Sequence, residues 1–145
     1  NWYGRGPHEN YIDRLTSAHV GKYQSNVADL YVPYVRPQEN GYRSDVRYVS
    51  FHNQDGKGIT FKGAPLIGFG AQYYDTADYH ATAAQVKAKN LHPHELPKKE
   101  RIFVNIDYMQ RGVGGINTWG AKPLSDYIIP YLDYQYSYSF EPYNQ

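Results

Sequence analysis

Short runs rich in aromatic and β-branched residues, separated by turn sequences, are the feature that most constrains the fold of this chain. The turn sequences fall at 4–7, 37–41, 53–58, 62–65 and 112–115, and the runs between them at 43–51, 59–61, 66–74, 102–108 and 134–140. The last run, YQYSYSF, alternates aromatic and small polar residues, as a strand with one packed face does. This spacing predicts an all-β fold, and specifically a β-sandwich, in one domain that spans residues 1–145.

One segment breaks the strand pattern. Residues 76–89 are rich in alanine and contain neither glycine nor proline, and Asp75 or Thr76 is a suitable N-cap. We therefore expect one short helix here, ending before Pro93, with an extended or turning connection after it.

Composition excludes several classes of function. The formal charge of +1 gives no electrostatic basis for binding nucleic acid or an anionic membrane. No apolar run approaches the roughly 20 residues that a spanning helix needs. We also expect no targeting segment at the first residues, and the compartment stays open between bacterial cytoplasm and periplasm. The 17 tyrosines, against five phenylalanines, suit a sandwich with one side facing a partner or a sugar.

Two glutamates in the repeated pattern P-x-E-N are candidates for paired-carboxylate chemistry. Glu9 and Glu39 occupy the third position of this pattern at 7–10 and 37–40. Glycosidases use two carboxyl groups about 5–5.5 Å or about 6.5–9.5 Å apart. The pattern is also typical of a turn, because proline fixes φ and asparagine tolerates the left-handed region. We favour the turn at both positions.

The histidines raise the question of a zinc site. His92, His94 and Glu95 lie close in sequence, and His80 falls on the predicted helix. Histidine and carboxylate are zinc ligands, but the spacing matches no established zinc motif. A polar loop covering an edge of the sandwich is the favoured interpretation. The chain contains no cysteine, which excludes disulfides and thiolate ligands.

The segment GVGGINTWG, residues 112–120, combines four glycines with one of the two tryptophans. Glycine permits positive φ and close backbone approach. Trp119 could be a platform for a sugar, whose C–H face fits an indole ring, or a side chain buried in the core. Residue types alone favour burial for Trp119, and a structural role in a strand for Trp2.

Three blocks in order along the chain resemble large bacterial lactose-cleaving β-galactosidases of glycoside hydrolase family 2. They are WYGRGPHENYIDR at 2–14, YVPYVRPQENG at 31–41, and NIDY with GVGG and WG between 105 and 120. The segment HPHEL at 92–96 also fits. The chain is similar to the C-terminal small-chain domain of that family.

The resemblance implies a specific division of labour. The domain would be a supersandwich of the galactose-mutarotase type, of which this chain is the second half. The two catalytic glutamates of the retaining reaction, and the magnesium and sodium sites, would lie in an upstream (β/α)8 barrel of the same polypeptide. No catalytic residue or metal ligand is therefore expected in this segment.

The same resemblance assigns the substrate-binding residues. Trp119 would pack against the bound galactoside, with Asn117 beside it. Some family members carry two acidic residues before Ser-Trp, where this chain has Ile116, Asn117 and Thr118. The alternatives are a stand-alone carbohydrate-binding or mutarotase-like module and a purely structural element. A half-sandwich also exposes strand edges, so we expect the isolated chain to self-associate.

Overall fold

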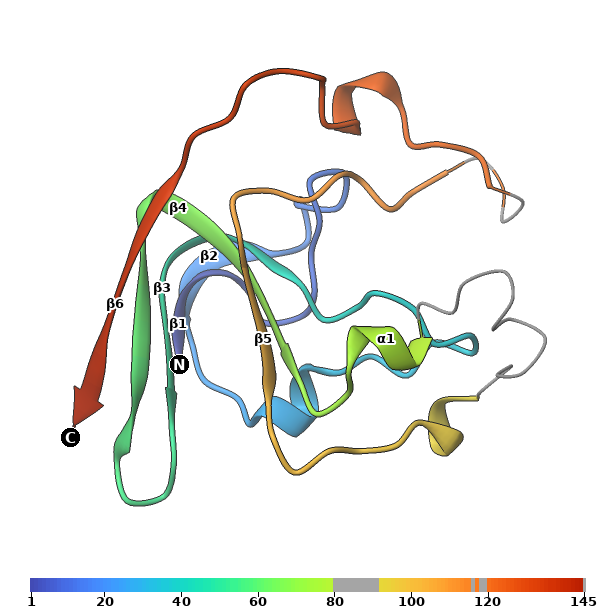
Figure 1. The fold of residues 1–145 in the computed structure, drawn as a ribbon. Helices are drawn as coiled ribbons and strands as arrows, with labels where there is room; N and C mark the ends of the chain where they lie inside the picture. Colours follow the sequence, from blue (N-terminus) through green and yellow to red (C-terminus); the bar gives the residue numbers. More distant parts are fainter. Residues whose placement is uncertain (80–91, 116, 118–119, 145) are drawn as a thin grey trace.

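A computed structural model describes residues 1–79, 92–115, 117 and 120–144, which form a six-stranded antiparallel sheet (Figure 1). The strands are β1 (Trp2–Gly6), β2 (His19–Tyr23), β3 (Arg43–His52), β4 (Lys57–Gln72), β5 (Phe103–Asp107) and β6 (Ser137–Asn144). Their order is β2-β1-β3-β4-β5, and β6 also pairs with β4. The all-β prediction is confirmed, while the second layer of a sandwich stays a prediction.

Strand β4 organises the sheet because two strands share one of its edges. Its first half, from Lys57 to Ala64, pairs with β6, and its second half, from Gly68 to Gln72, pairs with β5. Between these halves the register against β3 shifts, and residues 63–66 form an irregularity. Such bulges bend a strand. The predicted turn at 62–65 is therefore wrong: the predicted strands 59–61 and 66–74 are one bent strand.

The hydrophobic core lies on one face of this sheet. Its buried side chains come from β1, β3, β4 and one 3-10 turn, and are Trp2, Val46, Val49, Ile67, Phe69, Ala71 and Leu30. Trp2 packs its ring edge-on against Phe69 with centroids 5.8 Å apart, and its Nε1 donates a hydrogen bond to the Arg5 carbonyl at 3.0 Å. The predicted structural role of Trp2 is confirmed.

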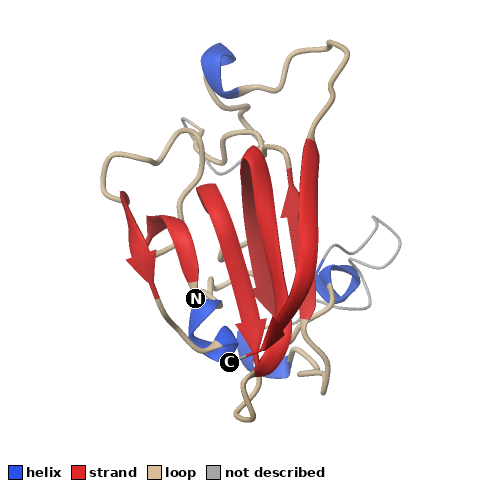
Figure 2. Ribbon diagram, turned by 90° about the vertical axis from the view of Figure 1, so that its left-hand side faces the viewer, coloured by secondary structure: helices blue, strands red, loops and turns tan. Residues whose placement is uncertain are grey.

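The opposite face of β4 is covered in its second half. A Cβ at Gly68 would overlap the phenol of Tyr42, whose ring stacks on Tyr11 with centroids 5.7 Å apart. All six residues of β4 from Ile67 to Gln72 are consequently buried. Figure 2 shows the strands side by side in one curved sheet, with loops and helical turns gathered around its ends.

Helical structure is limited to short pieces. They are α1 (Thr76–Tyr79) and three 3-10 turns, η1 (Val27–Leu30), η2 (Pro93–Glu95) and η3 (Ser125–Tyr127). Asp75 caps α1, since its Oδ1 accepts a hydrogen bond from the Ala77 amide at 3.0 Å. Residues 80–89 of the predicted helix lie outside the described residues. Within the described ranges, no helix is long and apolar enough to cross a membrane.

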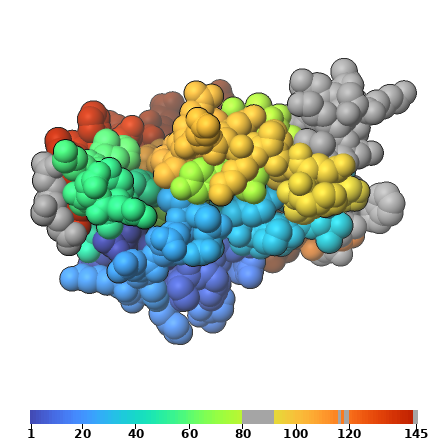
Figure 3. All heavy atoms as spheres, turned by 90° about the horizontal axis from the view of Figure 1, so that it is seen from below, coloured from blue at the N-terminus to red at the C-terminus, as the bar shows by residue number. Residues whose placement is uncertain are grey.

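Figure 3 shows one face of the molecule, on which the N-terminal segments (blue to cyan) lie beside the connection at 92–100 (yellow). The Lys99 amide donates to the Tyr73 carbonyl at 2.8 Å, which ties this connection to the end of β4.

Candidate functional site

The glycine-rich loop is anchored at its root by close backbone contacts. Gly112 is buried, and its amide donates a hydrogen bond to the Tyr127 carbonyl at 2.7 Å. The Gly114 amide donates to Asp13 Oδ2, also at 2.7 Å. A Cβ at Gly112 would lie 2.6 Å from that same oxygen and 2.8 Å from the Tyr127 Cβ. Glycine at 112 is therefore required by the close approach of two neighbouring segments.

The loop closes on itself a few residues later. A Cβ at Gly115 would lie 2.8 Å from the Ala121 carbonyl oxygen, so the outgoing and returning chains touch. Gly120 has φ of +95°, a conformation that side chains rarely adopt. The sequence predicted two reasons for glycine in this loop, and both are present: close backbone approach at Gly112 and Gly115, and positive φ at Gly120. We call residues 116–120, which lie between Gly115 and Ala121 in the sequence, the tip of the loop.

The two predicted substrate-binding residues fall in this tip. Trp119 lies outside the described residues, so whether it is a sugar platform or a buried side chain stays a prediction. Asn117 lies in an exposed bend beside the contact between Gly115 and Ala121. Its assignment to substrate binding also stays a prediction.

Glu9 is a buried structural carboxylate. It is 3% exposed, and Oε2 accepts a hydrogen bond from the Gly41 amide at 2.8 Å. Oε1 accepts from the Tyr34 hydroxyl and from Arg14 Nη1, the latter at 3.1 Å. With both oxygens engaged in internal hydrogen bonds, this group links three segments of the chain.

The two P-x-E-N segments form equivalent turns. In each, the asparagine amide donates to the carbonyl two residues earlier, Asn10 to His8 at 3.2 Å and Asn40 to Gln38 at 2.9 Å. Each asparagine Oδ1 accepts a backbone amide from another segment, that of Ser44 and Val32 respectively. Both segments are bends, but neither asparagine adopts the left-handed region that the predicted turn assumed.

Glu39 has a different neighbourhood, which the sequence did not indicate. Burial and the nearby Asp107 carboxylate raise the pKa of Glu39, and a hydrogen bond from Gln110 opposes that shift. Burial also raises the pKa of Asp107, whose Oδ2 accepts from Gln110 Nε2 at 3.2 Å. Asp107 is the last residue of β5, so its proximity to Glu39 depends on the fold of the chain and not on the local sequence.

A cavity of about 670 Å³ is lined by Glu39 and by Arg111 and Val113, the two neighbours of Gly112 in the sequence. The rest of its wall is formed by two tyrosines, two amides and two apolar side chains, namely Tyr11, Tyr34, Gln38, Gln110, Met109 and Ile129. Aromatic faces combined with planar hydrogen-bonding groups can hold a polar organic ligand.

The histidine segment is a capped turn. The His92 and His94 rings stack with centroids 5.7 Å apart, and Glu95 Oε2 accepts the His92 amide at 2.7 Å. Glu95 is thus occupied in capping η2. His80 lies outside the described residues, and across the described ranges no group of three or more His, Asp or Glu side chains could hold a metal.

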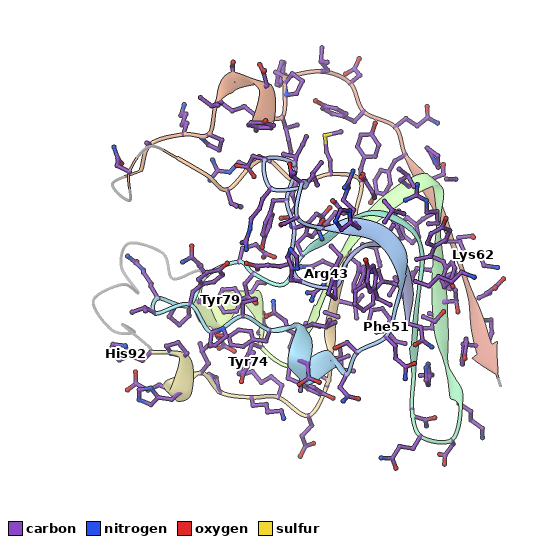
Figure 4. All side chains as sticks on the ribbon, turned by 180° about the vertical axis from the view of Figure 1, so that it is seen from behind. Arg43, Phe51, Lys62, Tyr74, Tyr79 and His92 are labelled. Carbon is purple, nitrogen blue, oxygen red and sulfur yellow. The ribbon has the colours of Figure 1, made fainter. Side chains whose placement is uncertain are left out.

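Arg43 is a buried cation near the centre of the molecule (Figure 4). Its guanidinium donates to the carbonyls of Leu30, Gly41 and Pro7 at 2.6–3.2 Å and lies over the Trp2 ring, 5.6 Å from the centroid. Burial lowers the pKa of Arg43 to about 10. It joins the P-x-E-N turns to the core, a role that no local sequence signal could reveal.

Comparison with known proteins decides the family. The family described as "Beta galactosidase small chain" matches residues 1–141. The chain belongs to this family. A protein named β-galactosidase from Priestia megaterium is 37% identical over 139 residues, which cover 96% of this chain and 13% of the relative. Those from Vibrio cholerae and Pseudoalteromonas haloplanktis are 38% and 34% identical, over 94% of this chain and 12% of each relative.

Membership of the β-galactosidase small-chain family confirms the resemblance drawn from the three sequence blocks. The chain spans only 12–13% of the length of these curated relatives. Both P-x-E-N turns, the end of β5 and the glycine-rich loop lie within the matched residues, so the whole candidate site belongs to the small-chain region.

Proposed function

We propose that this chain is part of a retaining β-galactosidase, in which it provides scaffold and an aromatic surface for the sugar. The enzyme hydrolyses terminal β-D-galactosides such as lactose. The observation that carries the proposal is the family match over residues 1–141, together with relatives named β-galactosidase. The upstream barrel domain of the same polypeptide is the partner of this chain and holds the catalytic glutamates.

Trp119 is the contact between this chain and the galactoside. The weakly positive C–H face of a sugar packs on the negative face of an indole ring, and aromatic contacts contribute about 0.5–1.5 kcal/mol beyond area burial. The anchored root at Gly112 and Gly114 supports this role, because it limits the paths that the tip can take. Asn117, two residues earlier, offers an amide to a sugar hydroxyl.

The chain alone has no galactosidase activity. Both oxygens of the Glu9 carboxylate accept internal hydrogen bonds, and the residue is only 3% exposed. The role of the Glu9 carboxylate is therefore structural, and the magnesium and sodium ions of the reaction belong to the barrel.

Kinetics of the full polypeptide test the proposal. Trp119→Ala raises KM for lactose about two- to tenfold, as loss of an aromatic contact of about 0.5–1.5 kcal/mol requires. Trp119→Phe keeps a ring and has a smaller effect. Tyr131→Ala, which removes a fully exposed ring elsewhere, is the matched control. Unchanged KM and kcat in Trp119→Ala would refute the platform role.

The second candidate is a carbohydrate-binding module that acts without the barrel. The cavity between the second P-x-E-N turn and the loop root favours it, since its wall includes Tyr11, Tyr34 and Gln110. Titration of the isolated chain with galactose separates the two functions. Saturable quenching of tryptophan fluorescence supports the module, and its absence supports the enzyme domain.

A further inference from the structure

We propose that Asp13 is the positioning residue of the glycine-rich loop, holding its root in the direction that brings Trp119 to the sugar. The inference rests on the proposed function of Trp119. Asp13 does not itself touch the substrate. Its carboxylate acts through the backbone of Gly112 and Gly114, which it contacts from the N-terminal part of the chain.

The placement of Asp13 follows from a local turn. The Arg14 amide donates to the Tyr11 carbonyl at 2.7 Å, and the two residues form an isolated β-bridge. This turn directs the Asp13 carboxylate at a segment 101 residues later in the sequence, where Oδ2 accepts the Gly114 amide at 2.7 Å. A hydrogen bond to an ionised acceptor is shorter and stronger than one between neutral groups.

Steric contacts point to the same residue. The atom nearest to a Cβ built at Gly112 is Asp13 Oδ2, at 2.6 Å. Among the described residues, the neighbours of such a Cβ at Gly114 are Asp13 Oδ2 at 3.0 Å and Cγ at 3.9 Å. A side chain at either position would collide with the Asp13 carboxylate, so both glycines are needed for this contact. The Tyr127 carbonyl holds Gly112 from the other side.

The second carboxylate oxygen has no partner. Asp13 Oδ1 is buried and accepts no hydrogen bond in the described part of the chain. A buried oxygen left unpaired is costly, and each such group in a native protein calls for an explanation. We infer that Asp13 is retained for its hold on the loop.

The loop needs an anchor of this kind. A segment with four glycines loses much conformational entropy when it is ordered, so its own residues do not fix its direction. Catalytic and binding geometry is sensitive to displacement, and a shift of about 1 Å can cost about 100-fold in rate. One charge-assisted bond at the root sets the direction of the tip.

A double-mutant cycle in the full polypeptide tests the inference. The variants are Asp13→Ala, Trp119→Ala and the double variant, with exposed Asp133→Asn as the control for loss of a carboxylate. We expect Asp13→Ala to raise KM for lactose about three- to tenfold with a smaller change in kcat, by loss of a charge-assisted bond. In the Trp119→Ala background the same change adds less than twofold, because the ring it positions is gone.

Asp13→Asn and Gly114→Ala keep the test decisive if Asp13→Ala fails to fold. Asparagine retains an acceptor oxygen, so it preserves the loop better and raises KM less than alanine does. Gly114→Ala places a methyl group 3.0 Å from Oδ2 and displaces the root without altering Asp13. It should raise KM in the wild-type background and leave KM unchanged in the Trp119→Ala background.

The outcomes separate the two proposals. If Trp119→Ala leaves KM unchanged, the platform function is wrong and the inference fails with it. If Trp119→Ala raises KM while the Asp13 and Gly114 variants behave as wild type, only the positioning role is wrong. Fully additive effects of Asp13→Ala and Trp119→Ala on KM also overturn the positioning role. They would show that Asp13 affects KM by a route that does not involve the Trp119 ring.

Discussion

At the scale of single residues, buried polar side chains join segments that lie far apart in sequence. Glu9 bonds to Gly41, 32 residues away, and Arg43 reaches Pro7, 36 residues away. The bends at the two P-x-E-N segments were predictable, because in each the asparagine amide donates a hydrogen bond to a carbonyl only two residues earlier. The partners of Glu9 and Arg43, and the contact between Asp13 and Gly114, were not predictable, since no periodicity encodes contacts over such separations.

Replacing Glu9 tests the carboxylate junction. Glu9→Gln removes a charge and leaves one of the donors from Gly41, Tyr34 or Arg14 poorly paired in the interior. We expect a loss of about 1–3 kcal/mol in the free energy of unfolding, measured by chemical denaturation of the 145-residue chain.

The control for Glu9→Gln is Glu141→Gln. Glu141 forms an exposed ion pair with Lys62 at 2.5 Å, with about half of each side chain accessible. Its loss should change stability by less than about 1 kcal/mol. Equal effects of the two variants would contradict a structural role for Glu9.

The carboxylates of Glu39 and Asp107 predict a pH dependence. Burial raises the pKa of each above its ordinary value of 4.5 or 3.8, so the folded state binds these protons more tightly than the unfolded chain. Their contribution to stability is therefore complete below about pH 4 and is lost as the pH rises through the raised values.

Asp107→Asn should flatten this decline above about pH 4, because it removes one titrating group and the charge that raises the pKa of Glu39. The free energy of unfolding, measured at intervals of pH, checks it. Asp55→Asn, in the exposed turn between β3 and β4, serves as the control. A steeper decline in Asp107→Asn would contradict the assignment.

At the scale of elements, the strands with clear alternation were predictable and the irregular ones were not. β3 and β5 coincide closely with the predicted runs 43–51 and 102–108, whereas β6 overlaps its predicted run only over residues 137–140. β1 and β2 contain glycines and short polar residues that mask their pattern. Gly63 and Pro65 resemble a turn in sequence, but pairing with β3 and β6 on either side carries the chain through as a bulge.

Two glycines of β4 offer a matched test of packing at this scale. Gly68→Ala would drive a methyl group into the buried Tyr42 ring, and we expect a loss of about 1–3 kcal/mol from overpacking. Among the described residues, none lies within 4 Å of a Cβ added at Gly70, so Gly70→Ala should be neutral or stabilise by about 0.4–1 kcal/mol. Thermal unfolding compares them, and equal midpoints would contradict the packing described here.

At the scale of the whole molecule, the chain leaves a large apolar surface uncovered. Exposed aromatic and aliphatic side chains extend along the segment before β6 and along β6 itself, among them Leu132, Tyr134, Tyr138 and Phe140. A single domain rarely exposes contiguous apolar surface of this kind without a partner. The sequence indicated a half-sandwich only through family resemblance, because local patterns cannot say what covers a sheet face.

This surface predicts self-association of the isolated chain. We expect concentration-dependent oligomers in analytical ultracentrifugation, since burying the exposed rings and the free edge of β6 is favourable. Phe140→Ser, at a position 68% exposed, should weaken association, and Ser139→Ala on the same strand should not. A monomer at all concentrations would show that the face needs no partner.

Addition of the chain in trans tests the central claim most directly. The measurement is lactose hydrolysis by the polypeptide truncated before Asn1, alone and after mixing with the purified 145-residue chain. We expect little activity from either part, recovery on mixing, and a higher KM when the added chain carries Trp119→Ala. Full activity with an unchanged KM in the truncated polypeptide alone would contradict it, because this chain would then contribute neither scaffold nor sugar contact.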